Sequence, residues 1–280
     1  MVESTYKSTF STVCEMIKPS TEDYIFEATE LCCHFLSVSK MEFITTDLPV
    51  EKTVYDKLIN AAKTRAKGYP LQYIIGEWEF YGRKFDVGEG VLIPRADTET
   101  LIDVVLEYAK DKQNLKVVDL CSGSGCIAVT IAKGLSNVEV YAIEKSEEAY
   151  DYLLKNIKKN TANVNPKLAD VLTFDENLSE FDIVVSNPPY LTNKQMKTLQ
   201  KEVGFEPEMA LYGQDDGLFF YKEITKLWKN RIKTGGLLAY EIGQGQENAV
   251  TAILNEHGFK TICQRADLCD IIRVIYGIKN

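Results

Sequence analysis

The stretch from Phe181 to Tyr190, which reads FDIVVSNPPY, decides how the rest of the chain is interpreted. Its first six residues form an apolar run typical of a buried strand, and the two prolines that follow prevent this strand from continuing in a sheet. The chain must therefore turn at the carboxyl end of a strand, which is where open α/β sheets build their binding sites.

The four residues of that turn are Asn187, Pro188, Pro189 and Tyr190, and we call them the elbow. Neither proline has an N–H, so the backbone carbonyls are held rigidly and competing donors are removed. An amide side chain and an aromatic ring lie at the two ends. This combination suits a flat, neutral NH₂ group, which needs carbonyl acceptors and an aromatic face. A plain proline-rich loop after a strand explains the tetrapeptide alone equally well.

A second strand-and-turn motif lies earlier in the chain. The apolar run Val117–Leu120 leads into a small-residue turn, and the helical run Cys126–Ala132 follows it. Glycines in such a turn let a ligand approach the backbone, and the helix N-terminus offers unpaired N–H groups. With Ala128, the turn also satisfies the weak dinucleotide pattern Gly-x-Gly-x-x-Gly/Ala. The residues of this turn are Cys121, Ser122, Gly123, Ser124 and Gly125.

Acidic residues lie near three strand ends, and the first two favour S-adenosylmethionine over a dinucleotide. Asp119, just before the turn, would repel a pyrophosphate and attract an ammonium group; S-adenosylmethionine carries an ammonium and no phosphate. Glu144 closes the next strand, where a carboxylate can accept both ribose hydroxyls. Asp170 ends the third strand and could bond the adenine amino group, with Val171 beside it. Glu144 and Asp170 could also be surface acids.

The second part of the chain predicts an α/β fold. From Asp97 onward, strands and helices alternate in the βαβ manner. The last two apolar runs, 259–264 and 271–275, lie too close together for a crossover helix and should pair antiparallel. We therefore expect a Rossmann-like sheet that is mostly parallel, with an antiparallel last strand. The parallel strands are expected at 116–120, 139–143, 165–169, 181–186 and 236–241.

Three regions are predicted along the chain. Residues 1–73 should form a small helical domain, because apolar residues recur at helical spacing and Pro19 and Pro49 separate the helices. Residues 74–95 predict an aromatic-rich β-hairpin linker. Residues 96–280 predict the cofactor-binding domain. The first helical face is carried by Phe10, Val13, Cys14 and Ile17.

The composition is that of a globular protein, with 45% hydrophobic and 26% charged residues and a net charge of -9. This acidic balance argues against a dedicated nucleic-acid binder. Seven cysteines without a Cys-x-x-Cys pair, and only two histidines, predict no metal site and free thiols in a reducing cytoplasm. No secretory leader or membrane-spanning run is visible. We expect a cytoplasmic monomer.

Taken together, the turn and the elbow resemble the Rossmann-like methyltransferases. More narrowly, the chain resembles the HemK/PrmC family of protein-(glutamine-N5) methyltransferases, which modify peptide-chain release factors. The resemblance spans most of the chain from about residue 68, while the N-terminal helices match only in general character. Two departures are Cys121, where the family usually has glycine, and Glu144, where aspartate is common. The matching motifs are Gly76–Gly82, Val91–Glu99, Asp119–Ala128, Glu206-Pro207, Ala210-Leu211 and Asp215–Leu218.

The resemblance implies transfer of a methyl group from S-adenosylmethionine to the side-chain amide nitrogen of the glutamine in a Gly-Gly-Gln motif of release factors, leaving S-adenosylhomocysteine. The turn and Glu144 would hold the cofactor, and the elbow would hold the glutamine. The Asn187 side-chain oxygen and the Pro188 carbonyl would each accept one N–H, while Tyr190 would pack on the amide plane.

Three other readings remain open at this point. An N6-adenine or other nucleobase-amino methyltransferase would present the same flat NH₂ to the elbow, but it should need a basic, aromatic-lined groove. A non-catalytic protein could keep the fold as a binding module. An NAD-dependent enzyme would use the turn for a dinucleotide, although no plausible acid/base for hydride transfer is visible.

Overall fold

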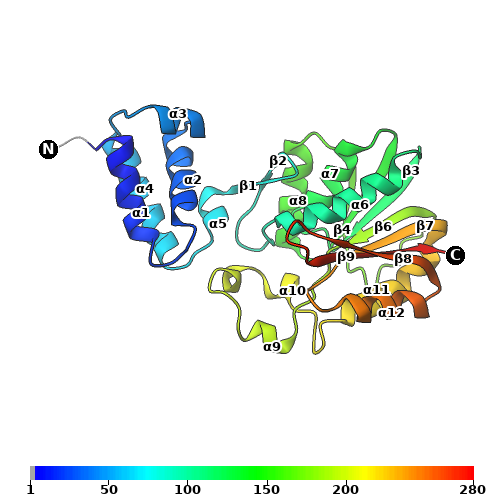
Figure 1. Cartoon of the computed structure of the whole chain (residues 1–280). Helices are drawn as coiled ribbons and strands as arrows, with labels where there is room; N and C mark the ends of the chain where they lie inside the picture. The colour runs from blue at the N-terminus through cyan, green and yellow to red at the C-terminus, as the bar shows by residue number, and fades with distance from the viewer. Residues whose placement is uncertain (1–3) are drawn as a thin grey trace. The chain divides into compact units, whose positions relative to one another are not determined.

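The computed structural model describes residues 4–280, which form two compact units (Figure 1). A helical unit comprises the described residues up to Glu77 together with Gln200–Phe205, and a larger unit comprises Trp78–Leu199 and Glu206–Asn280. The chain therefore returns once to the helical unit. The division into three regions at 1–73, 74–95 and 96–280 stays a prediction, because the two compact units do not test these boundaries.

Within the described residues, the helical unit is built from five α-helices. Three of them, α1, α2 and α4, pack against one another. Val13, Cys14 and Ile17 of α1 are buried, as the apolar spacing predicted. The short helices α3 and α5 were not predicted, because five or six residues do not establish a helical period. The helices are α1 (Tyr6–Ile17), α2 (Tyr24–Leu36), α3 (Lys40–Thr45), α4 (Lys52–Ala66) and α5 (Leu71–Ile75).

A buried ion-pair cluster joins these helices to the returning segment Gln200–Phe205. Arg65, in the last turn of α4, has a fully buried side chain. Its guanidinium donates to Glu27 of α2, with 2.8 Å between Nη2 and Oε1, and also to Glu202 of the returning segment. A buried charge is costly unless it is paired. These two carboxylates are therefore what allows Arg65 to lie inside the unit.

The larger unit contains a seven-stranded sheet with the strand order β5-β4-β3-β6-β7-β9-β8. The first five of these strands are parallel, and β9 runs antiparallel to both β7 and β8. This confirms the predicted sheet. A separate pair, β1 (Glu77–Phe80) and β2 (Arg83–Asp86), forms the predicted hairpin. The seven strands are β3 (Leu115–Leu120), β4 (Val138–Glu144), β5 (Val164–Leu168), β6 (Phe181–Ser186), β7 (Ile232–Glu241), β8 (Phe259–Ala266) and β9 (Ile272–Lys279).

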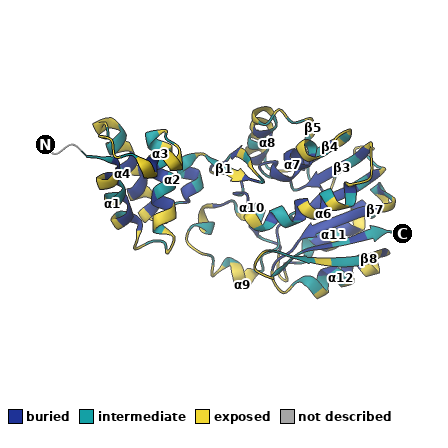
Figure 2. Ribbon diagram, turned by 45° about the horizontal axis from the view of Figure 1, so that its top comes forward, coloured by how far each residue is buried: buried dark blue, intermediate teal, exposed yellow. Residues whose placement is uncertain are grey.

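Helices cover both faces of the sheet, and the strand residues alternate between the two layers. Val117 and Val185 join the core beneath α6, α7 and α8, whereas Val118 and Val184 join the core beneath α11 and α12. Figure 2 shows the resulting burial along the strands. The helices of this unit are η1 (Ala96–Thr98), α6 (Glu99–Ala109), α7 (Cys126–Gly134), α8 (Glu147–Lys159), α9 (Asn193–Met196), α10 (Glu208–Leu211), α11 (Phe219–Trp228), η3 (Lys229–Arg231) and α12 (Glu247–Glu256); η2 (Val203–Phe205) belongs to the returning segment.

The strand order reverses between β3 and β6. From β3 the chain proceeds outward through β4 and β5, and then it crosses to β6 and continues through β7 in the other direction. Because these strands are parallel, their carboxyl ends meet at one edge of the sheet. In open α/β folds a ligand binds at this edge, beside the point of reversal. The turn after β3 and the elbow after β6 are therefore neighbours.

Within residues 4–280, no helix has both the length and the apolar character needed to cross a membrane. The same part of the chain contains no cluster of three or more His, Cys, Asp or Glu side chains arranged to hold a metal ion. Its seven cysteines are all free thiols.

We predict that Glu27→Ala destabilises the protein by about 3–5 kcal/mol, because it leaves Arg65 buried with one of its two carboxylates. Urea unfolding followed by circular dichroism would measure this loss. The matched control is Glu107→Ala, which breaks the pair between Glu107 and Arg265, whose side chains are 60% and 38% exposed. An exposed pair should contribute no more than about 1 kcal/mol. Equal losses in the two variants would contradict the role given to Arg65.

Candidate active site

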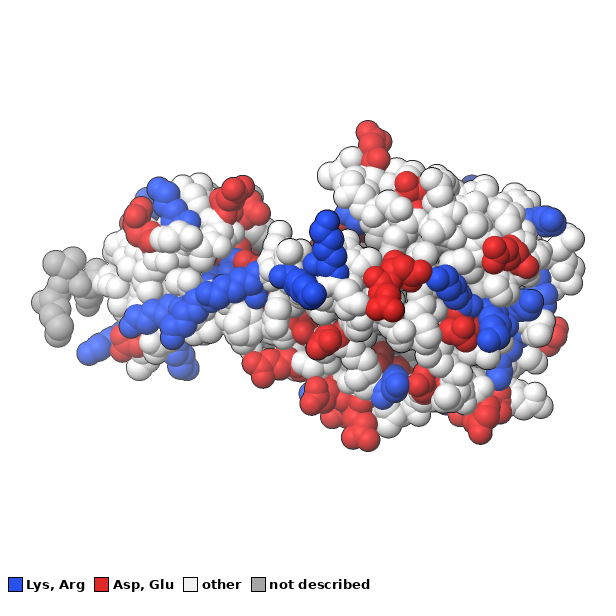
Figure 3. All heavy atoms as spheres, turned by 90° about the horizontal axis from the view of Figure 1, so that it is seen from below, with Lys and Arg blue, Asp and Glu red and all other residues white. Residues whose placement is uncertain are grey.

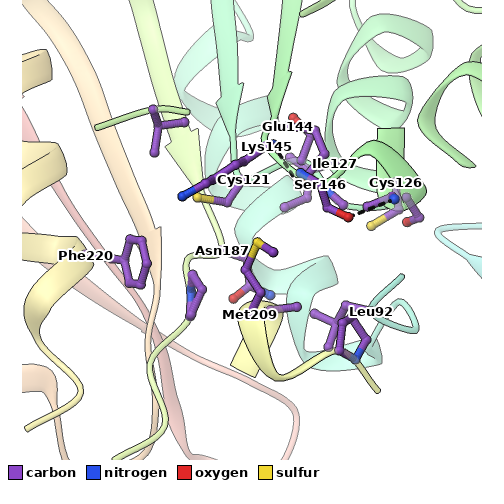
Figure 4. A pocket seen from close by; sticks show the side chains of 18 of the residues that line it. Leu92, Cys121, Cys126, Ile127, Glu144, Lys145, Ser146, Asn187, Met209 and Phe220 are labelled. Carbon is purple, nitrogen blue, oxygen red and sulfur yellow. Dashed lines mark hydrogen bonds between the residues drawn. The ribbon is translucent and has the colours of Figure 1, made fainter. Parts of the chain in front are cut away.

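A cavity of about 310 Å³ opens at the carboxyl edge of the parallel strands. Its wall is formed by the turn after β3, the residues that follow β4, β5 and β6, and the segments 90–98 and 207–220. This volume lies at the lower end of the range for small-molecule sites. Figure 4 shows Cys121, Glu144, Lys145 and Ser146 on one side of the cavity, and Leu92, Asn187 and Met209 on the other.

The two glycines of the turn after β3 have different functions. Gly123 has a φ of 53°, and a Cβ added there would meet no atom within 4 Å. It lines the cavity, so a ligand can approach the backbone at this position. Gly125 has a φ of 79°, and a Cβ there would lie 2.4 Å from Leu153 Cδ1 of α8. The structure thus places Gly125 in the packing of two helices rather than in the cavity wall.

Cys121 adopts a φ of 60°, in the left-handed region that favours glycine. A side chain in this region costs about 1–2 kcal/mol, so the departure from the usual glycine carries strain. Burial raises the pKa of the Cys121 thiol well above its usual value, and the nearby Glu144 and Asp119 charges add to the shift. The thiol therefore stays protonated at neutral pH and is a poor nucleophile.

Glu144 is the best-held acceptor in the cavity wall. One carboxylate oxygen accepts a hydrogen bond from Gly123 N at 2.7 Å. The other accepts from Lys145 N and Ser146 N, both at 2.8 Å. Backbone donors are fixed by the fold, so the carboxylate is oriented without any contribution from a ligand. Each oxygen retains acceptor capacity toward the cavity.

Asp170 and Val171 both line the cavity. The Asp170 carboxylate accepts from Leu172 N at 2.9 Å and pairs with Lys145 Nζ at 2.9 Å. Burial alone would raise its pKa, but these two partners hold the pKa below its usual value. Asp170 is therefore ionised, and a ligand amine would compete with Lys145, whose side chain is 61% exposed.

Asp119 lies behind the turn rather than in the cavity wall. Its carboxylate is fully buried, and Oδ2 accepts from Ala128 N at 3.2 Å, while Oδ1 has no hydrogen-bond partner in the described residues. Burial raises the pKa of Asp119 to about 8. The carboxyl is then mostly protonated at pH 7, and it connects the end of β3 to the start of α7. This placement does not match the predicted attraction of an ammonium group.

Two of the four elbow residues, Asn187 and Pro189, line the cavity. Asn187 Nδ2 points to Thr98 Oγ1 at 3.4 Å. Pro188 is buried and is not part of the cavity wall, and neither is Tyr190. The elbow therefore presents one side-chain amide to the cavity.

Tyr190 is where the elbow is clamped. Its carbonyl accepts a hydrogen bond from Gln246 Nε2 at 3.0 Å. A Cβ at Gly213 would lie 2.6 Å from Tyr190 Cα, and one at Gly217 would lie 2.3 Å from Tyr190 O. The ring lies beside Gly243 instead of facing the cavity, and burial raises the pKa of its phenol well above the usual range. The backbone of Tyr190 is thus held by two separate segments, the loop that contains Gly213 and Gly217 and the residue Gln246.

Several cavity residues were given no role from the sequence. Arg95 lines the cavity and forms an ion pair with the buried Glu206, which also accepts from Ile93 N at 3.1 Å. The two sequence motifs that contain these residues were recognised, but nothing in the sequence indicated that they contact each other. The apolar wall was also missed, because its residues come from segments far apart in the chain: Leu92, Ile127, Met209, Phe219 and Phe220.

Comparison with known proteins agrees with this geometry. Residues 83–204 match the family model described as the methyltransferase small domain, and residues 15–76 match the PrmC N-terminal domain. Among solved structures, a methyltransferase from Pyrococcus furiosus is 15% identical, with a TM-score of 0.52 over 82% of this chain and all of that one. The T. Thermophilus 16S rRNA methyltransferase RsmC, in complex with AdoMet and guanosine, is 17% identical, with a TM-score of 0.54. That match covers 73% of this chain and half of the RsmC chain.

The family model over residues 83–204 marks this part of the chain as a methyltransferase domain, and the fold agrees with it. Curated relatives narrow the class. A release factor glutamine methyltransferase from Thermodesulfovibrio yellowstonii is 39% identical over 90% of this chain and 91% of the relative. One from Clostridium acetobutylicum is 35% identical over 95% of each chain. The chain belongs to the release factor glutamine methyltransferase family.

We predict that Cys121→Gly keeps the fold and the affinity for S-adenosylhomocysteine, because glycine adopts a φ of 60° without strain. Cys121→Val should lose both, because a β-branched residue is a true outlier at positive φ. Thermal unfolding and isothermal titration calorimetry would measure the two variants. If Cys121→Val bound the ligand as well as Cys121→Gly, the backbone of the turn would not be constrained as described.

Proposed function

We propose that this enzyme methylates the side-chain amide nitrogen (N5) of the glutamine in the Gly-Gly-Gln motif of peptide-chain release factors. The observation that carries the proposal is the position of Asn187. This neutral amide belongs to a clamped elbow and lines the same cavity as the carboxylate of Glu144 and the open backbone of Gly123. The names of the curated relatives support the same substrate.

The residues of the cavity fit the cofactor. We propose that Glu144, already oriented by three backbone N–H groups, accepts the two ribose hydroxyls. Asp170 and Val171 would contact the adenine, and the remaining turn residues would line the path of the amino-acid part. When bound, S-adenosylmethionine supplies an electrophilic methyl group on a positively charged sulfur. Asp119 and Gly125 would act indirectly, by holding the turn and its helix in place.

The elbow addresses the main chemical difficulty. An amide nitrogen is a poor nucleophile, because its lone pair is delocalised into the carbonyl. The Asn187 side-chain oxygen, which lines the cavity, would accept one N–H of the glutamine. The Pro188 carbonyl, which lies outside the cavity wall in this structure, would accept the other N–H once the substrate is bound, so that the nitrogen is held in line with the methyl group. As the nitrogen becomes cationic these bonds strengthen, so they stabilise the transition state more than the bound substrate. The methylated nitrogen then loses a proton to solvent.

The aromatic contact predicted for Tyr190 must come from a different residue. The Tyr190 ring lies beside Gly243 and outside the cavity wall, whereas Phe219 and Phe220 line the cavity. We propose that Phe220 covers the glutamine and excludes water, while Tyr190 contributes through its clamped backbone. Pro189 would form the part of the cavity wall between Phe220 and Tyr190.

A protein substrate agrees with the charge of the molecule. Across the face of the larger unit that Figure 3 shows, acidic and basic side chains are interspersed, and that face carries no broad basic surface. A nucleobase-amino methyltransferase would need such a surface to hold the phosphate backbone. We further propose that the enzyme works as a monomer in the cytoplasm, where its release factor substrates would be found.

We predict that Asn187→Ala binds S-adenosylmethionine normally but transfers methyl groups about 10²–10³ times more slowly, by analogy with the loss of an oxyanion-hole donor. The assay uses tritiated S-adenosylmethionine and a release factor, either wild type or with the motif glutamine replaced. Asn193→Ala is the matched control, because Asn193 bonds Asp215 and Tyr212 at the surface and should leave the rate unchanged.

Two results would contradict the proposal. Label on the glutamine-less release factor would mean that another group is methylated. A rate for Asn187→Ala within a few-fold of wild type would remove the elbow from the mechanism. An oligonucleotide containing unpaired adenines serves as the substrate for the rival activity, and we expect it to remain unlabelled.

A further inference from the structure

A buried acid that the mechanism does not use lies next to the elbow. β6 and β7 are parallel neighbours in which Ser186 pairs with Tyr240. The next residue in each chain segment is Asn187 after β6 and Glu241 at the end of β7. These two residues therefore lie side by side at the carboxyl edge of the sheet. Glu241 is only 2% exposed, so its carboxylate is buried behind the cavity wall.

The surroundings of Glu241 do not form an ion pair that would explain a buried carboxylate. The cation that acts on Glu241 is Arg273 of β9, whose guanidinium pairs with Asp97 at 2.9 Å and with Asp267 at 3.0 Å. The polar side chains that face the Glu241 carboxylate and lower its pKa are those of Thr98 and Asn187. Its Oε2 has no hydrogen-bond partner in the described residues. Because an unpaired buried charge is costly, this arrangement points to a function.

The function follows from the two-sided nature of an asparagine amide. Oδ1 only accepts and Nδ2 only donates, and a half-turn of the amide exchanges them. A substrate NH₂ needs Oδ1. A carboxylate accepts only, so it selects Nδ2 on its own side. Thr98 Oγ1 can accept from Nδ2, at 3.4 Å, which leaves its own hydrogen available to the Glu241 carboxylate. Thr98 and Glu241 thus leave Oδ1 of Asn187 directed to the cavity.

We propose that Glu241 is a positioning residue for methyl transfer: together with Thr98, its carboxylate holds the Asn187 amide with Oδ1 directed toward the substrate. The inference rests on the proposed function of the elbow. It goes beyond it by naming the group that decides which end of the amide the glutamine meets. A neutral side chain in the place of Glu241 could donate to Oδ1 and stabilise the opposite, unproductive orientation.

This arrangement makes the orientation sensitive to pH. Burial raises the pKa of Glu241 to about 7, with Asp97 adding to the shift and Thr98, Arg273 and Asn187 opposing it. When pH falls through this value the carboxyl gains a proton and can donate, so the preference for one orientation is lost. The activity should therefore decline on the acid side of about pH 7.

The other titratable groups around Glu241 do not produce that decline. They are Tyr190, Tyr221 of α11 and Cys126 of α7, and the pKa of each is raised far above neutrality. Asp119, whose pKa is raised to about 8, lies in the cofactor turn and is unchanged by a substitution at Glu241. A loss of the acid limb on substituting Glu241 therefore identifies its source.

The test is Glu241→Gln, which keeps the size of the side chain and removes its charge. We expect kcat on a release factor to fall about 10- to 100-fold, as for loss of orientation, while KM for S-adenosylmethionine stays unchanged. The acid limb near pH 7 should disappear. Thr225→Val is the matched control: it removes an equally buried polar contact, 3.0 Å from Thr225 Oγ1 to Tyr240 Oη on the same strand, without reaching the elbow. Its kcat should be unchanged.

Two further measurements separate this proposal from the proposed function. Adding Glu241→Gln to Asn187→Ala should cause no extra loss, because the carboxylate acts only through Asn187. In wild-type enzyme without substrate, the ¹H–¹⁵N signals of the Asn187 side chain, assigned by their absence in Asn187→Ala, should shift with an apparent pKa of about 7. They should not shift with pH in Glu241→Gln.

An unchanged kcat in Glu241→Gln, or Asn187 signals that ignore pH in the wild-type enzyme, would overturn the positioning role. If the wild-type enzyme fails to label any release factor, the proposed function fails. The Asn187 signals then still decide whether Glu241 orients this amide.

Discussion

The site depends on the parallel pairing of β3 with its two neighbours, β4 and β6. This pairing brings a glycine turn, a strand-end carboxylate and a proline elbow to one edge of the sheet, although the turn and the elbow are more than sixty residues apart in the chain. Each strand then contributes a rigid group whose position is fixed by ladder hydrogen bonds. The turn is fixed further by Glu144, and the elbow by Gln246.

Three buried carboxylates at this edge differ in function because they accept hydrogen bonds from different groups. Glu144 accepts three backbone N–H groups and faces the cavity, which suits it to bind hydroxyls. Asp119 is enclosed with one backbone donor, so burial dominates and its pKa rises to about 8. The Glu241 carboxylate accepts no backbone N–H among the described residues, and burial raises its pKa to about 7. The same functional group thus serves as a ligand contact, a structural connection and an orienting partner.

The sequence predicted the sheet because each strand is an apolar run ended by a polar or breaking residue, as in Phe181–Ser186 before the prolines. It also predicted that Glu144 and Asn187 belong to the site, because Glu144 ends one strand and Asn187 comes directly after another. It could not separate Gly123 from Gly125, since the need for glycine at the second position comes from Leu153 of a distant helix. The orientation of the Tyr190 ring is likewise set by loops far away in the chain.

A crystal structure with S-adenosylhomocysteine and a Gly-Gly-Gln peptide would test the central claim most directly. The account predicts that the glutamine side-chain nitrogen lies about 2.7–3.2 Å from Asn187 Oδ1 and faces the cofactor sulfur. A glutamine bound outside the cavity, or an Asn187 amide that presents Nδ2 to the substrate, would contradict it.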